Sequence, residues 1–120
     1  MCLVICETFL KDKDVVTIPG YLWIGHNRTK LSKKAARGSG GVGVLIKESL
    51  LCNYTSSILN NSYEGILWLS FNHINSSNSF CLCACYLPPS GSSRGDSSVE
   101  FFETLRTQIM LFYPLGDLII

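Results

Sequence analysis

The sequence predicts a layered domain of the α/β (α+β) class, made mostly of strands with one clear helix. Short apolar stretches rich in β-branched and aromatic residues alternate with Gly, Pro, Asn and Ser turns along most of the chain. One later segment instead carries apolar residues at helical spacing. The length of 120 residues suits a single domain with a core, and the 47% hydrophobic content argues against disorder.

Four strands are expected in the N-terminal half. They span residues 3–6, 21–26, 41–47 and, as a weaker pattern, 51–58. The first is an uninterrupted apolar run, which predicts a strand buried on both faces. Pro19-Gly20 marks the turn before the second strand. In the third strand Val42, Val44 and Ile46 alternate, so they share one face.

A hairpin follows in the second half of the chain. The segments 66–71 and 80–86 predict its two strands, and the Asn/Ser-rich stretch 72–79 joins them. Cys81, Cys83 and Cys85 alternate along the second strand with apolar neighbours, so both faces of this strand are expected to be buried.

One helix is expected over residues 98–112. Ser97 and Glu100 form an S-x-x-E capping box at its start. Helical spacing predicts that its inward face carries Val99, Phe102, Leu105, Ile109 and Phe112. Pro114 and Gly116 end the helix, and the apolar run 118–120 begins a last strand.

The charge of the chain is unevenly distributed although its net value is only +1. Between Val15 and Lys47 there is no acidic residue. The basic residues in this stretch that we consider for nucleic-acid binding are Arg28, Lys30, Lys33, Lys34 and Arg37. Such a segment is typical of a loop that faces a polyanion, and equally of a solvated loop that keeps a protein soluble.

Six cysteines raise the alternatives of disulfides, zinc binding and buried thiols. Zinc ligands usually come from C-x2-4-C turns that converge on one point, whereas the C-x-C-x-C pattern spreads its thiols along a strand. Buried, reduced cysteines are therefore the favoured interpretation, which indicates a reducing, intracellular compartment. No apolar run approaches the roughly 18 residues of a membrane span, so no membrane is expected as a partner.

Two other patterns are interpreted as structural. Residues 38–43 match G-x-G-x-x-G, but a strand follows them where a dinucleotide site needs a helix. These glycines are expected to allow close approach within the sheet or a bulge. His26 and His73 have no cluster of metal ligands at suitable spacing and are interpreted as ordinary surface histidines.

Glu7 is the strongest single candidate for a functional residue. It is a lone carboxylate directly after the first apolar strand, and such a charge needs water, a partner or a metal. Open α/β sheets place their chemistry at the carboxyl ends of strands. Tyr86 closes the second hairpin strand beside Pro88-Pro89, either as a boundary aromatic or as a hydroxyl that contacts phosphate.

Taken together, these segments resemble the endonuclease/exonuclease/phosphatase superfamily. The segment 6–10, Cys-Glu-Thr-Phe-Leu, looks like the family's E-T-[WF]-L segment. Residues 37–46 are similar to its Arg-Gly-rich strand, and residues 86–89 to its Tyr-x-Pro-Pro corner. A helix from Ser98 and a strand from Gly116-Asp117 follow in the family's order. The resemblance is strongest to endonuclease domains of non-LTR retrotransposons, which nick target DNA before reverse transcription.

The resemblance implies a DNase I-like fold, here a partial two-sheet sandwich flanked by helices. It implies a nuclear or cytoplasmic phosphodiester hydrolase that acts on DNA beside a reverse transcriptase domain in the full-length protein. Glu7 would be its catalytic carboxylate and would bind Mg²⁺ or Mn²⁺, which neutralises charge at the scissile phosphate. Tyr86 would position that phosphate. The basic residues between 28 and 37 would contact the DNA backbone.

The resemblance also implies that residues 1–120 are a single partial domain, truncated at both ends. The family's first strand would precede Met1, and its Gly-Asp-Phe-Asn strand end and its Asp-His pair would follow Ile120. We therefore expect weak or absent metal binding and no nuclease activity from these residues alone. The alternatives are a non-catalytic nucleic-acid-binding module, using the basic loop with Tyr21, Trp23 and Tyr86, and a structural or zinc-binding protein.

Overall fold

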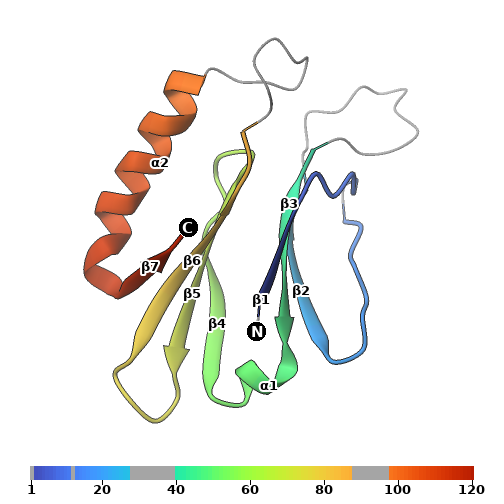
Figure 1. Cartoon of the computed structure of the whole chain (residues 1–120), viewed down its shortest axis with the longest axis vertical. Coiled ribbons are helices and arrows are strands. Elements are labelled where there is room, and N and C mark those ends of the chain that lie inside the picture. The colour runs from blue at the N-terminus through green and yellow to red at the C-terminus, as the bar shows by residue number, and fades with distance from the viewer. Residues whose placement is uncertain (1, 12, 28–39, 88–97) are drawn as a thin grey trace.

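The computed structural model describes residues 2–11, 13–27, 40–87 and 98–120 and contains two sheets and one long helix (Figure 1). The three-stranded sheet has the order β1 (Cys2–Cys6), β3 (Val42–Lys47), β2 (Tyr21–His26). The four-stranded sheet has the order β4 (Tyr54–Asn60), β5 (Ile66–His73), β6 (Ser79–Cys85), β7 (Asp117–Ile119). Among the strand pairs of the described residues, β6–β7 alone is parallel. The helix α2 (Ser98–Phe112) lies between β6 and β7 in the sequence, which confirms the predicted mixture of strands with one clear helix.

The layers are α2, the four-stranded sheet and the three-stranded sheet, in that order (Figure 1). Apolar side chains between the two sheets form one core cluster, whose fully buried members include Val44, Leu67 and Phe71. A second cluster, with Trp68, Cys83 and Phe101, fills the space between the four-stranded sheet and α2. Alternate residues of β5 and β6 therefore enter different cores.

Most of the predicted strands form where the sequence places them. The hairpin prediction is confirmed by the β5–β6 pairing, in which Ile66 lies opposite Cys85 and Phe71 opposite Phe80. The alternation predicted for the third strand is also confirmed, because Val42, Val44 and Ile46 all face the core between the sheets. The weak fourth strand begins later than expected, because residues 48–51 form the short helix α1 (Glu48–Leu51).

The first strand differs from its prediction in burial. β1 forms, but Leu3 is 51% exposed and Val4 is 40% exposed, so the expectation of a strand buried on both faces is wrong. The reason is its position at the edge of its sheet, where β3 is its one hydrogen-bonded neighbour among the described strands. An apolar run of this length does not distinguish a central strand from an edge strand, since that difference depends on distant parts of the chain.

Glycine allows close packing within the three-stranded sheet, as the sequence suggested for residues 38–43. The indole of Trp23 lies directly over Gly43, and a Cβ atom at position 43 would overlap its ring. Gly25 is similarly covered, with Trp23 Nε1 2.6 Å from where a Cβ would stand. The two glycines, opposite each other on neighbouring strands, thus form the flat surface on which Trp23 rests.

The inward face of α2 is confirmed in its second half, where Phe112 is buried and Leu105 and Ile109 pack against the same core, and differs from the prediction near its start. Phe101, Gln108 and Phe112 are buried, whereas Val99 and Phe102 are exposed. A buried hydrogen bond of 2.9 Å from Trp68 Nε1 to Gln108 Oε1 selects this orientation. Because Gln108 is polar, the apolar pattern assigned it to the wrong side. The predicted end of the helix is confirmed, since Tyr113–Leu115 form a short 3-10 turn before Gly116.

No helix in the described ranges combines the length and the apolar character needed to cross a membrane. Ser97, the first residue of the predicted capping box, lies outside the residues that the structure describes; Glu100 lies in the first turn of α2.

The two adjacent phenylalanines of α2 give a matched test of this orientation. Phe101 is 4% exposed and Phe102 is 58% exposed. Phe101→Ala is expected to reduce the free energy of unfolding by roughly 3–5 kcal/mol because it empties part of a packed core. Phe102→Ala is expected to change it by about 0.5 kcal/mol or less. Urea unfolding of both variants measures the difference; equal losses would contradict the orientation of α2.

Candidate functional site

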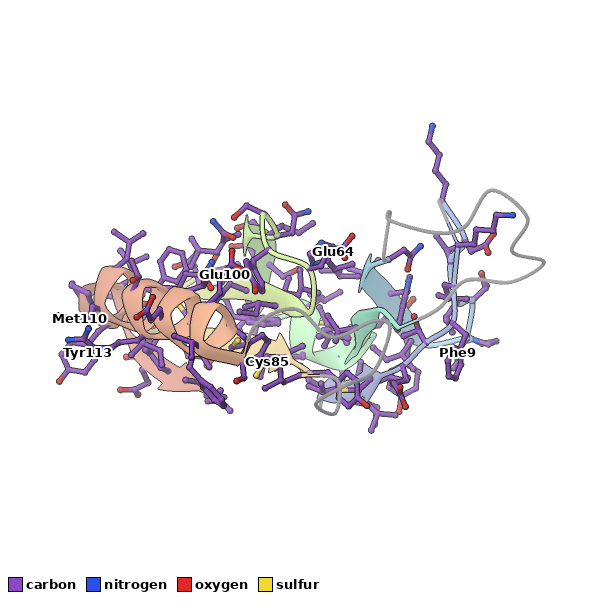
Figure 2. All side chains as sticks on the ribbon, turned by 90° about the horizontal axis from the view of Figure 1, so that it is seen from above. Phe9, Glu64, Cys85, Glu100, Met110 and Tyr113 are labelled. Atoms are coloured by element: carbon purple, nitrogen blue, oxygen red, sulfur yellow. The ribbon has the colours of Figure 1, made fainter. Side chains whose placement is uncertain are left out.

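The carboxyl ends of β1, β2 and β6 meet at one edge of the two sheets. Cys6 and His26 flank Val42 from opposite sides in the three-stranded sheet. Across the interface, Cys6 Sγ lies 3.8 Å from the carbonyl oxygen of Cys85, and His26 Nδ1 lies 3.2 Å from that of Ile66. We call this place the strand-end edge; Figure 2 looks down on it, with Cys85 and Glu64 near the middle of the molecule.

Glu7 is the first residue after β1 and lies half-buried at the strand-end edge. Its φ is 51°, and that of Phe9 is 55°, both in the left-handed region that few residues other than glycine adopt. Hydrogen bonds hold the segment in this conformation: Phe9 N–H donates to the carbonyl of Gly40 at 2.9 Å, and Thr8 N–H to that of Gly41 at 3.3 Å. The backbone that carries Glu7 is thus held by the two glycines that directly precede β3.

Tyr86 is the first residue after β6 and lies half-buried against the core between the sheets. Its N–H donates to the carbonyl of Gly65 at 2.9 Å. Gly65 has a φ of 85°, and a Cβ at this position would stand 2.7 Å from the Tyr86 carbonyl oxygen. A side chain at position 65 would therefore displace the backbone of Tyr86.

The structure brings the two predicted catalytic residues to the same edge. Glu7 follows Cys6 and Tyr86 follows Cys85, and Cys6 contacts the backbone of Cys85 directly. The two residues come from different sheets and are distant in sequence. The five basic residues predicted to bind nucleic acid, Arg28, Lys30, Lys33, Lys34 and Arg37, lie outside the described residues.

His26 was interpreted as an ordinary surface residue, and this interpretation is wrong. The ring is half-buried and bridges the two sheets through its contact with the Ile66 carbonyl. Because a carbonyl oxygen only accepts, Nδ1 must carry the hydrogen, so Nε2 of the neutral ring keeps a lone pair. The signal in the sequence was its place at a strand end, the same signal that pointed to Glu7.

Glu64 is a second carboxylate at the strand-end edge that sequence reasoning did not select. It is half-buried and directly precedes Gly65, which pairs with Tyr86. It precedes a strand, whereas Glu7 and Tyr86, the residues predicted from the sequence, each follow one. In an antiparallel hairpin the start of one strand lies beside the end of the next, so the residue before β5 could have been predicted to lie near Tyr86.

The described residues fit a metal ion only in part. Glu7 offers a hard oxygen ligand of the kind that Mg²⁺ prefers. Within the described ranges, however, no three His, Cys, Asp or Glu side chains gather closely enough to hold a metal ion. Mg²⁺ commonly keeps several waters and takes one or two carboxylates together with phosphate oxygens. The edge therefore suits a weakly held ion whose binding depends on a phosphate ligand.

The thiols beside this edge differ in their acidity. All six cysteines are free. Cys81 and Cys83 are buried as predicted, whereas Cys2 and Cys85 are half-buried and Cys6 and Cys52 are exposed, so the interpretation as buried thiols holds only in part. A hydrogen bond with Cys83 lowers the pKa of Cys85, against the opposing effect of burial. The same bond, together with burial, raises the pKa of Cys83. Burial raises the pKa of Cys6, and the nearby Cys85 and Glu7 add to this effect.

These shifts predict an order of alkylation as the pH rises. The hydrogen bond from Cys83 stabilises the Cys85 thiolate, so Cys85 is expected to react with iodoacetamide at a lower pH than Cys6. Cys83→Ala removes the bond and is expected to move the Cys85 reaction to higher pH. Cys81→Ala, which empties the next position on the same face of β6, is the control. Mass spectrometry of individual cysteines across a pH series measures this, and a Cys85 profile unchanged by Cys83→Ala would refute it.

No protein-family model matches the chain, and no curated protein and no solved structure matches it.

Proposed function

We propose that this chain carries part of the active site of a metal-dependent DNA endonuclease related to those of non-LTR retrotransposons. One observation carries the proposal: Glu7 and Tyr86 come from two different sheets and lie at the same strand-end edge. Both residues belong to segments that resemble motifs of the endonuclease/exonuclease/phosphatase superfamily. Two independent motifs that converge in space support a shared role better than either does alone.

Each residue has a distinct part in this proposal. The Glu7 carboxylate binds Mg²⁺ or Mn²⁺, and such an ion supplies charge neutralisation at a phosphodiester. The Tyr86 hydroxyl donates a hydrogen bond to a phosphate oxygen and fixes its position. Hydrogen bonds from residues 8, 9 and 86 to neighbouring backbone hold the main chain at both positions, which supports preorganisation of the site. In this proposal DNA is the substrate of the nuclease, and a reverse transcriptase domain accompanies the site in the full-length protein.

A binding experiment tests the role of Glu7. The affinity of the chain for a short DNA duplex, measured by fluorescence anisotropy, is expected to rise when Mg²⁺ is added. Glu7→Gln is expected to remove this increment, a loss of about tenfold or about 1.4 kcal/mol. Glu48→Gln is the matched control, because Glu48 is an exposed carboxylate on α1, at the far end of β3. Tyr86→Phe is expected to weaken binding with and without the ion.

Two results would contradict the proposal. One is affinity that does not respond to Mg²⁺, and the other is an equal response in the Glu7→Gln and Glu48→Gln variants. Binding that falls with salt and ignores Mg²⁺ would instead favour the non-catalytic nucleic-acid-binding module, in which basic side chains neutralise backbone phosphates without a metal.

A second experiment concerns catalysis itself. The chain is expected to leave supercoiled plasmid intact in the presence of Mg²⁺, because the resemblance assigns the activation of water to motifs that these 120 residues do not match. Conversion to open circles, followed by gel electrophoresis, is the measurement. Nicking by the wild-type chain that disappears in Glu7→Ala would show that the described edge is sufficient for catalysis, contrary to expectation.

A further inference from the structure

The helix α2 carries a second apolar face that the proposed nuclease site does not use. Val99, Phe102 and Met110 on α2, and Tyr113 in the 3-10 turn that follows it, are each more than half exposed. Together with Arg106 they recur at intervals of three and four residues, so they follow one side of the helix. This side lies roughly a third of a turn from the face that packs on the sheet. Figure 2 shows Met110 and Tyr113 at the helix side of the molecule, away from Phe9.

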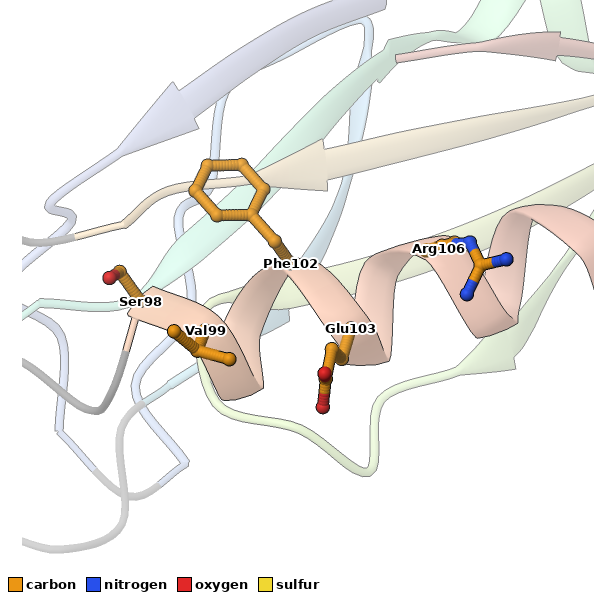
Figure 3. A pocket seen from close by; sticks show the side chains of 5 residues that line it. All are labelled: Ser98, Val99, Phe102, Glu103 and Arg106. Carbon is orange, nitrogen blue, oxygen red and sulfur yellow. The ribbon is translucent and has the colours of Figure 1, made fainter.

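The first half of this face is hollowed. A shallow recess of about 330 Å³ is lined by Ser98, Val99, Phe102, Glu103 and Arg106 (Figure 3). We call the set Val99, Phe102, Glu103, Arg106 and Met110 the outer stripe. Exposed apolar side chains that gather along one helix face are typical of an interaction surface, whereas isolated ones are common on any protein.

The charges of the outer stripe identify the partner that fits it. Glu103 and Arg106 lie at its middle, and neither forms an ion pair with any other part of the chain that the structure describes. Val99 precedes Glu103 by one helical turn, and Met110 follows Arg106 by the same interval. When a second α2 helix runs in the opposite direction, its Arg106 therefore lies opposite Glu103, and its Met110 lies opposite Val99. A stripe with this symmetry is complementary to itself in the antiparallel orientation.

We propose that a second copy of this chain docks on the outer stripe, with the two α2 helices antiparallel about a twofold axis. Glu103 faces the partner's Arg106, and the partner's Glu103 faces Arg106. Val99 meets the partner's Met110 at each end of the contact. Phe102 lies over the recess beside the aliphatic stem of the partner's Arg106, where an aromatic face and a guanidinium attract each other.

The small area of the outer stripe limits the affinity of the proposed dimer. One helix pair buries less than the interfaces of permanent dimers, so the dimer is expected to dissociate in the micromolar range. Insertion into a lipid surface is disfavoured because Glu103 stands in the middle of the apolar face, where burial in hydrocarbon is costly.

Charge exchange tests the antiparallel arrangement. Sedimentation velocity of the whole chain over a concentration series is expected to show reversible dimers. Each single variant, Glu103→Arg or Arg106→Glu, makes both facing 103–106 pairs of the dimer alike in charge. Each is expected to weaken dimerisation by at least about tenfold. An equal mixture of these two variants is expected to form heterodimers, because every facing pair is again opposite in sign. The double variant Glu103→Arg with Arg106→Glu is expected to dimerise with itself.

A charge change away from the outer stripe serves as the control for these variants. Glu48→Arg makes the same charge change on α1, away from the stripe, and is expected to dimerise like the wild type. Circular dichroism checks that each variant is folded. The proposal is overturned if the wild type stays monomeric, if Glu103→Arg associates like the wild type, or if the mixture associates no better than its components. Co-purification of two differently tagged copies gives the same readout when a variant is poorly soluble, and indiscriminate co-purification of all variants also overturns it.

Discussion

β5 and β6 need apolar cover on both faces, and the remaining elements are arranged to provide it. Along β5, Leu67 and Leu69 enter the core between the sheets, while Ile66 and Trp68 enter the core beneath α2. On β6, Leu82 and Ala84 enter the core between the sheets, and Cys81 and Cys83 enter the core beneath α2. Neither the three-stranded sheet nor α2 could be removed without exposing several large side chains to water, which would cost more free energy than a typical domain retains.

The candidate site is a consequence of this layered arrangement. Two sheets that pack face to face bring the ends of their strands together, so residues that follow β1 and β6 become neighbours without any direct sequence relation. The His26 contact with the Ile66 carbonyl joins the sheets at the same edge. The left-handed conformation at Glu7 is compatible with a functional position, because strained backbone is retained where surrounding bonds hold it in place.

Local patterns were sufficient to predict the strands with strong alternation. Val42, Val44 and Ile46 and the β5–β6 hairpin lie where the sequence placed them, since two-residue periodicity and flanking turns are properties of short segments. The inward face at the start of α2 was not predictable in this way, although Leu105, Ile109 and Phe112 pack inward as their spacing predicted. The Phe101-Phe102 pair supports two orientations of the helix, and the choice depends on a hydrogen bond between Gln108 and a tryptophan on another strand. The exposure of β1 likewise depends on which strand it pairs with. For the site, the sequence alone predicted Glu7 and Tyr86. It could not predict that they share an edge, that His26 bridges the sheets or that Glu64 lies beside them, because these features depend on how distant segments pair.

The order β1-β3-β2 also constrains how the chain reaches this structure. β1 has no hydrogen-bonded contact with β2, the next strand in the sequence, and pairs instead with β3. The entropic cost of closing a loop grows with its length, so the short β5–β6 connection favours early formation of that hairpin. β1, which ends one residue before Glu7, can join its sheet only once β3 presents an edge. The edge that carries Glu7 is therefore expected to assemble later than the β5–β6 hairpin.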